Sequence, residues 1–183
     1  SYYYSLPQLG VSASVRLGKD QQSLSGKAWL DHEWSDALLA PDAIGWDWIG
    51  INLDDGAALT AFRLRNRAGE AVWAGGSWRS ASGALTVFDA KDVLFAPMRW
   101  WKSPHSQASY PVQWSVQLLR QELPAPLRAL QVSALIDDQE LDSRRSTGTI
   151  YWEGLSRLSD LSGKSLGLGY LEMTGYAAPL RLS

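Results

Sequence analysis

The 183-residue sequence contains no cysteine, which excludes disulfides, thiolate nucleophiles and cysteine-based zinc sites. It has no block of basic residues and a formal net charge of −2, so the electrostatic footprint of a nucleic-acid-binding protein is missing. Its apolar runs are short and are interrupted by glycine and charged residues, so no segment is predicted to cross a membrane as a helix.

Phenylalanine is scarce, whereas large aromatic residues with a polar atom are abundant. The chain has 3 phenylalanines against 10 tryptophans and 7 tyrosines. Tryptophan and tyrosine combine a large apolar body with a polar tip that requires a partner. Two interpretations remain open at this point: interfacial positions on a β-sheet, or the lining of a cavity for an apolar or conjugated ligand.

Alternation of apolar and polar residues predicts about ten short strands and no long helix. Asp55-Gly56 is a strong hairpin signal, and Pro7 to Gly10 predict a break before a strand at 11–17. The clearest further strands are expected at 24–35, 46–53, 59–65, 72–79, 112–118, 130–136, 147–158 and 166–174. We therefore expect one all-β domain over residues 1–183, as a sandwich or a closed barrel. A barrel of about eight to ten strands can enclose one small ligand.

The segment from Gly26 to Gly56 concentrates tryptophan, acidic residues and one of the two histidines. Side chains alternate between the two faces of a strand, which sorts the segment into two sets. One set holds His32, Trp34, Trp46 and Trp48, and the other holds Asp31, Glu33 and Asp47. With a regular register, the first set is predicted to line the barrel lumen, and Asp47 is not, unless a bulge turns it inward.

This segment suggests acid–base chemistry on an apolar substrate. A carboxylate stabilises a nearby imidazolium such as that of His32, which could then donate a proton near neutral pH. A carboxyl group among tryptophan rings has a raised pKa, and the rings could stabilise a carbocation. The alternative is that Asp31 and Glu33 point outward while His32 caps a turn or fills the core. A metal site at these three residues is not expected, because adjacent strand residues point to opposite faces.

The closing hairpin carries a second set of candidate residues. Tyr151 and Glu153 share one strand face, as do Tyr170 and Glu172 on the next strand. Together they could form a polar inner wall of a barrel. The alternative is a solvated outer face with aromatic pairs between strands.

Five segments resemble the AttH-like proteins, which are related to the carotenoid 1,2-hydratases (hydroxyneurosporene synthases) and are often labelled predicted secreted hydrolases. The segments are YYYSLP (2–7), GKAWLDHEWS (26–35), GWDWIGINLDDG (45–56), STGTIYWEG (146–154) and GYLEMTGY (169–176). The resemblance covers almost the whole chain. It implies a lipocalin-like (calycin-type) antiparallel β-barrel, equivalent to the C-terminal one of two such halves. An N-terminal half, or self-association in its place, is then an expected partner.

The resemblance also implies a function and a location. The hydratases add water to a terminal double bond without an organic cofactor, and a His-x-Trp pair and a downstream Asp matter in them. His32 and Trp34 match the pair, and Asp47 is the best match for the Asp. The AttH-like branch is associated with envelope transport operons, which implies a secreted or periplasmic protein.

Three functional hypotheses follow. The first is a hydro-lyase-like enzyme, without cofactor or metal, that acts on a hydrophobic unsaturated lipid or terpenoid by hydration or related carbocation or isomerisation chemistry. Its catalytic residues would be His32, Asp47 and Trp34, and its ligand-binding residues Trp46, Trp48, Tyr151, Glu153, Tyr170 and Glu172. The second is a non-catalytic carrier of a hydrophobic ligand that serves an envelope ABC-type transporter. The third, a secreted ester hydrolase, is weaker because the sequence shows no Ser–His–acid set.

Overall fold

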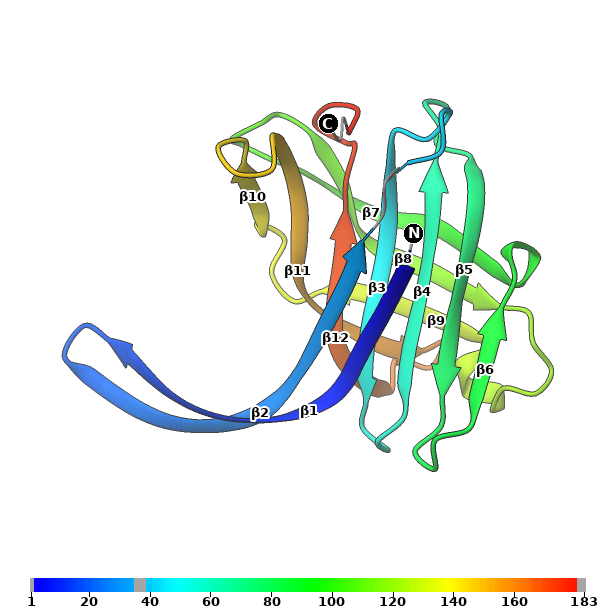
Figure 1. The fold of residues 1–183 in the computed structure, drawn as a ribbon, viewed down its shortest axis with the longest axis horizontal. Helices are drawn as coiled ribbons and strands as arrows, with labels where there is room; N and C mark the ends of the chain where they lie inside the picture. The colour runs from blue at the N-terminus through cyan, green and yellow to red at the C-terminus, as the bar shows by residue number, and fades with distance from the viewer. Residues whose placement is uncertain (1, 35–38, 181–183) are drawn as a thin grey trace.

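The computed structural model describes residues 2–34 and 39–180, which form twelve strands and two short 3-10 turns (Figure 1). The elements are β1 (Tyr2–Leu17), β2 (Asp20–Trp34), β3 (Gly45–Leu53), β4 (Ala58–Arg65), β5 (Ala71–Arg79), β6 (Leu85–Phe88), η1 (Ala90–Asp92), β7 (Val93–Lys102), β8 (Ser109–Leu118), η2 (Ala125–Leu127), β9 (Ala129–Ala134), β10 (Glu140–Ser143), β11 (Thr149–Asp160) and β12 (Ser165–Met173). No helix in this part of the chain is long and apolar enough to span a membrane.

Ten of these strands form one antiparallel sheet that curls into a barrel-like shell. The order is β6-β5-β4-β3-β12-β11-β9-β8-β7, with β10 paired to β11. No ladder joins β6 to β7 within the described residues, so the shell is open along that seam. The predicted all-β, lipocalin-like antiparallel barrel is confirmed.

The first two strands form a separate two-stranded ribbon. In Figure 1 the base of this hairpin crosses the outside of the sheet near β3 and β12, while its tip projects away from the barrel. The predicted break at Pro7 to Gly10 is wrong, because β1 continues through it. Since β1 pairs only with β2, a proline can be accommodated at the unpaired edge, and the irregularity is reduced to a register shift between Leu6 and Leu9.

Gln8 fastens the hairpin to the barrel at this register shift. Its backbone is in the left-handed region, with φ of 60°. Its N–H donates to Asn52 Oδ1 at 2.7 Å, and its side-chain Nε2 donates to the carbonyls of Leu53 and Ala57 at 2.9 and 2.7 Å. The strained residue thus satisfies polar groups at the end of β3 and fixes where the hairpin crosses the sheet.

The interior of the barrel is filled by side chains. Trp114, Tyr110 and Trp152 are fully buried, and Ile49 and Ile51 of β3 point into the same core. Asp47 shares their face and is also fully buried. The predicted orientation of β3 is therefore wrong: Asp47 points inward, and the tryptophans at 46 and 48 point outward.

Asp47 is stabilised in the core by groups that strand alternation alone does not reveal. Arg63 Nε and Arg65 Nε lie 2.8 and 3.0 Å from its Oδ2, and Tyr176 donates its hydroxyl to Oδ1 at 2.8 Å. The Arg63 guanidinium also lies 4.9 Å from the centroid of the Trp114 ring. One carboxylate thus forms ion pairs with two nearly buried guanidinium groups, and its contacts join β3, β4 and the segment after β12.

We predict that Asp47 is required for folding, because its removal leaves two buried arginines without their counter-charge. Asp47→Ala should lower the free energy of unfolding by about 3–5 kcal/mol, as measured by urea denaturation. The matched control is His32→Ala, an exposed position where the change should stay within about 0.5 kcal/mol. Equal effects of the two substitutions would contradict this role of Asp47.

Candidate functional site

The structure does not bring the predicted acid–base pair together. His32 and Trp34 lie on β2, opposite Tyr4 and Tyr2 of β1, with ring centroids 5.5 Å apart in each cross-strand pair. This face of the hairpin is exposed, and Trp34 retains 49% of its accessible surface. Asp47 lies inside the barrel, so His32 and Asp47 belong to different surfaces, and the prediction that His32 lines the lumen is wrong.

The opposite face of the hairpin contacts the outside of the sheet. The Tyr3 hydroxyl donates to Asp31 Oδ1 at 2.5 Å, and the Trp29 Nε1–H donates to the same oxygen at 2.8 Å. The ring of Trp29 meets that of Trp48 of β3 edge-to-face, with centroids 6.0 Å apart. Gly50 leaves room for both indoles, because a Cβ there would collide with the rings of Trp48 and Trp29.

Two further carboxyl groups lie on the sheet at this crossing. Glu153 of β11 is the direct neighbour of Glu172 of β12, which in turn is the direct neighbour of Trp48 of β3. The expected polar wall of tyrosine and glutamate is therefore on the outer face of the sheet and not on the inner one, where Trp152, Leu171 and Met173 are fully buried in the core. We call Tyr3, Trp29, Asp31, Trp46, Trp48, Glu153 and Glu172 the crossing site.

The carboxyl groups of the crossing site resist ionisation. Burial raises the pKa of Glu172 to about 7; a hydrogen bond from Trp46 partly opposes this, and the neighbouring Glu153 and Asp31 add to it. Burial and the Asp31 charge raise the pKa of Glu153. Burial also raises the pKa of Asp31, although the hydrogen bonds from Tyr3 and Trp29 counteract it. The site therefore holds a proton near neutral pH.

No cation balances these carboxyl groups in the part of the chain that the structure describes. The ion pairs found there involve other residues throughout. Across residues 2–34 and 39–180, no three His, Asp or Glu side chains are grouped so as to hold a metal ion. Two glutamates placed directly opposite each other on paired strands repel when both are ionised, which favours protonation of one of them.

A groove lies farther along the same outer face, and none of the residues that line it belongs to the crossing site. It has a volume of about 520 Å³ and extends between the hairpin, at Gln8 and Lys27, and the sheet. Its apolar floor is formed by Leu155, Leu168 and Tyr170, which remain 40%, 43% and 41% exposed. Tyr170 lies two residues from Glu172 on the same face of β12, which brings this floor near the crossing site.

Sequence reasoning found part of this site. The repeated Tyr-x-Glu pattern indicated Glu153 and Glu172, and Trp46 and Trp48 were expected beside a ligand. Tyr3 and Trp29 were missed, and Asp31 was assigned to a back face. The available signal was that Trp29 and Asp31 share a strand face; what the sequence did not reveal is that Tyr3 lies on the adjacent strand and that this face meets the barrel.

We predict that protonation of Glu172 makes stability depend on pH. Its pKa is about 7 when folded against an ordinary value of 4.5, so the folded state binds the proton more tightly. The contribution of Glu172 to the free energy of unfolding should be fully present below about pH 4.5 and should be lost, by up to about 3 kcal/mol, as the pH rises through about 7. Urea denaturation across this range should show the fall in the wild type and a much flatter profile in Glu172→Gln. The same fall in both proteins would disprove the assignment to Glu172.

Comparison with known proteins shows the family. The AttH-like family model matches residues 1–176. A crystal structure of a protein from Nitrosomonas europaea, provisionally named AttH, is 44% identical with a TM-score of 0.85, over 96% of this chain and 52% of that one. Kievitone hydratase from Nectria haematococca has a TM-score of 0.72 at 17% identity, over 97% of this chain and 53% of that one, a likeness that shows the fold alone.

The chain thus spans about half the length of each of these two structures. No curated protein sequence matches it. The family model nevertheless covers nearly every residue, including both strands of the hairpin and the three strands that carry the crossing site. The chain belongs to the AttH-like family.

Proposed function

We propose that this protein is a hydratase that adds water to a carbon–carbon double bond of a hydrophobic lipid or terpenoid, without an organic cofactor, and that Glu172 is its proton donor. The observation that carries the proposal is a largely buried carboxyl group beside indole rings, without a cationic partner among the described residues, and its burial raises its pKa to about 7. A general acid works best when its pKa is close to the working pH.

The chemistry can be followed atom by atom. The protonated Glu172 transfers its proton to one alkene carbon, and the π electrons form the new C–H bond. The resulting carbocation lies against the face of Trp48, whose ring stabilises positive charge, and near the Asp31 carboxylate. Water then adds to the cationic carbon, and its proton passes to the Glu172 carboxylate, which restores the acid. The net reaction is alkene plus water to alcohol.

The surroundings support such a step. Trp29 and Trp48 cover the site with apolar surface, and Tyr3 and Trp29 hold the Asp31 carboxylate by two hydrogen bonds to one oxygen. A cation that forms there meets fixed negative charge in a partly dry environment, where electrostatic stabilisation is larger than in water. The groove floor of Leu155, Leu168 and Tyr170 suits the apolar remainder of the substrate.

Kievitone hydratase shares the fold, which is compatible with hydration chemistry on this scaffold. The proposal differs from the sequence expectation in its residues, since the exposed His32 and the core residue Asp47 are replaced by Glu172 as the acid. A location in the cell envelope, and a second lipocalin-like half as a partner, stay predictions.

The groove also favours a second candidate function, a carrier that binds a hydrophobic ligand without turnover. The hydrolase hypothesis gains no such support. Among the described residues, no serine hydroxyl is hydrogen-bonded to a histidine side chain. Ser106, beside His105, donates to Glu140 instead.

Turnover of a probe separates the two candidates. We expect the wild-type protein to convert lycopene or oleic acid, presented in detergent micelles, to an alcohol in isotopically labelled water, detected by mass spectrometry. Glu172→Gln should reduce the rate by about 10²-fold or more, because it keeps the shape of the side chain but has no acidic proton. Glu70→Gln, on an exposed turn, is the matched control and should leave the turnover rate unchanged.

Binding measured by quenching of tryptophan fluorescence completes the test. Glu172→Gln should bind the probe about as well as the wild type. Binding without product in both proteins would support the carrier and refute the hydratase. Loss of turnover in His32→Ala but not in Glu172→Gln would refute the assignment of the acid.

A further inference from the structure

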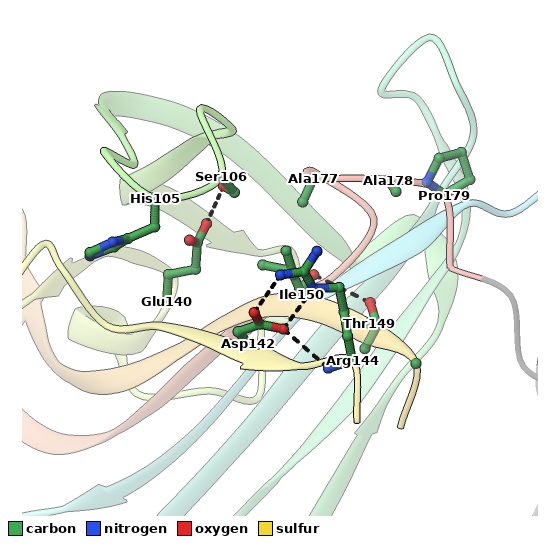
Figure 2. A pocket seen from close by; sticks show the side chains of 11 residues that line it. His105, Ser106, Glu140, Asp142, Arg144, Thr149, Ile150, Ala177, Ala178 and Pro179 are labelled. Atoms are coloured by element: carbon green, nitrogen blue, oxygen red, sulfur yellow. Dashed lines mark hydrogen bonds and ion pairs between the residues drawn. The ribbon is translucent and has the colours of Figure 1, made fainter. Parts of the chain in front are cut away.

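A second pocket lies at the end of the barrel where β10, β11 and the segment after β12 meet. Its volume is about 660 Å³, within the range typical of small-molecule sites. Figure 2 shows His105, Ser106 and Glu140 on one side of it, and Ala177 to Pro179 on the other. None of these residues belongs to the crossing site, so the pocket is a separate feature.

Glu140 is held in a defined position in this pocket. Ser103, which is fully buried, donates its hydroxyl to Glu140 Oε1 at 2.8 Å, and Ser106 donates to Oε2 at 2.5 Å. Ser103 Oγ in turn accepts the backbone N–H groups of His105 and Ser106 at 3.0 and 3.2 Å. The loop between β7 and β8 is thereby shaped around one carboxylate, as in preorganised binding sites.

The negative charge of Glu140 has no counter-charge within residues 2–34 and 39–180. Arg144 is engaged by Asp142, with Nε and Nη2 donating to its two oxygens at 2.9 and 2.7 Å (Figure 2). His105 Nε2 points to Asp138 Oδ2, 3.6 Å away. The Asp142–Arg144 pair is neutral as a unit, so the pocket carries the charge of Glu140.

A buried phenol lies behind this carboxylate. Tyr110 is fully buried, and its hydroxyl has no hydrogen bond of good geometry within residues 2–34 and 39–180. Burial, followed by a hydrogen-bonding interaction with Glu140 and the Glu140 charge, raises the pKa of Tyr110. Tyr110 does not line the pocket, so the feature that points to a ligand is the Glu140 carboxylate, which lines the pocket without a counter-charge among the described residues.

We propose that this pocket binds a small ligand that carries a primary ammonium group on a short apolar body. An ammonium group is a strong donor with three N–H bonds; it would neutralise Glu140 and donate to the carboxylate oxygens, which can accept more bonds than the two from Ser103 and Ser106. The apolar body would pack on Ile150, Ala177 and Pro179, which line the pocket beyond the carboxylate. The site is independent of the proposed hydration.

The test uses two probes of similar shape and opposite charge, n-butylammonium chloride and sodium butyrate, titrated into the full chain and followed by NMR. Butylammonium should produce saturable shifts of Ile150 and Ala177, and butyrate should not. Glu140→Gln should weaken butylammonium binding at least tenfold. Arg144→Gln should strengthen it about twofold or more, because Asp142 then adds negative charge.

Glu70→Gln removes one negative charge at an exposed turn and should leave binding unchanged, and thermal melting of each variant checks folding. The absence of saturable shifts, equal affinity for butyrate, or full binding by Glu140→Gln would each overturn the proposal.

Discussion

The two-residue period of β3 is the constraint on which both the core and the crossing site depend. Side chains alternate across a strand, so fixing Asp47 inward also fixes Trp48 outward. Inside, Asp47 joins two arginines and a tyrosine in a buried cluster. Outside, Trp48 lies beside Glu172 and beneath the hairpin. A shift of one residue in this register would place the indoles in a filled core and the carboxylate outside. The register that buries the Asp47 cluster is therefore the same one that places Trp48 beside Glu172.

The β1–β2 hairpin covers part of the outer face of the sheet and changes the environment of the carboxyl groups there. An isolated two-stranded ribbon is only marginally stable in water, and this one is anchored through Gln8 and through the contact of Trp29 with Trp48. Covering the sheet removes water from Glu172 and Glu153, and the described residues offer them no cation in exchange. The resulting rise in pKa costs folding stability above neutral pH, a cost that is common where a protein keeps a group ready for proton transfer.

Much of the fold could be predicted from the sequence, because alternation and hairpin turns are local signals. The strands from 46–53 to 166–174 and the antiparallel barrel are found as expected. Which side chains of β3 point into the barrel could not be predicted in the same way. Both of its faces are covered, one by the core and one by the hairpin, so apolar side chains on either face carry no information about direction. The arginines that stabilise the buried Asp47 come from β4, and this contact between strands is not revealed by the residue pattern of β3.

The site was partly predictable for the same reasons. The Tyr-x-Glu repeats indicated Glu153 and Glu172 because the two strands form a local hairpin. The role of Asp31 depends on the hairpin crossing the sheet, which no periodicity encodes.

The central claim is that Glu172 remains protonated near neutral pH. Its carboxyl carbon can be titrated directly by isotope-edited NMR, with Glu172→Gln used to assign the resonance. We expect a midpoint near 7, and a midpoint near the ordinary 4.5 would contradict it.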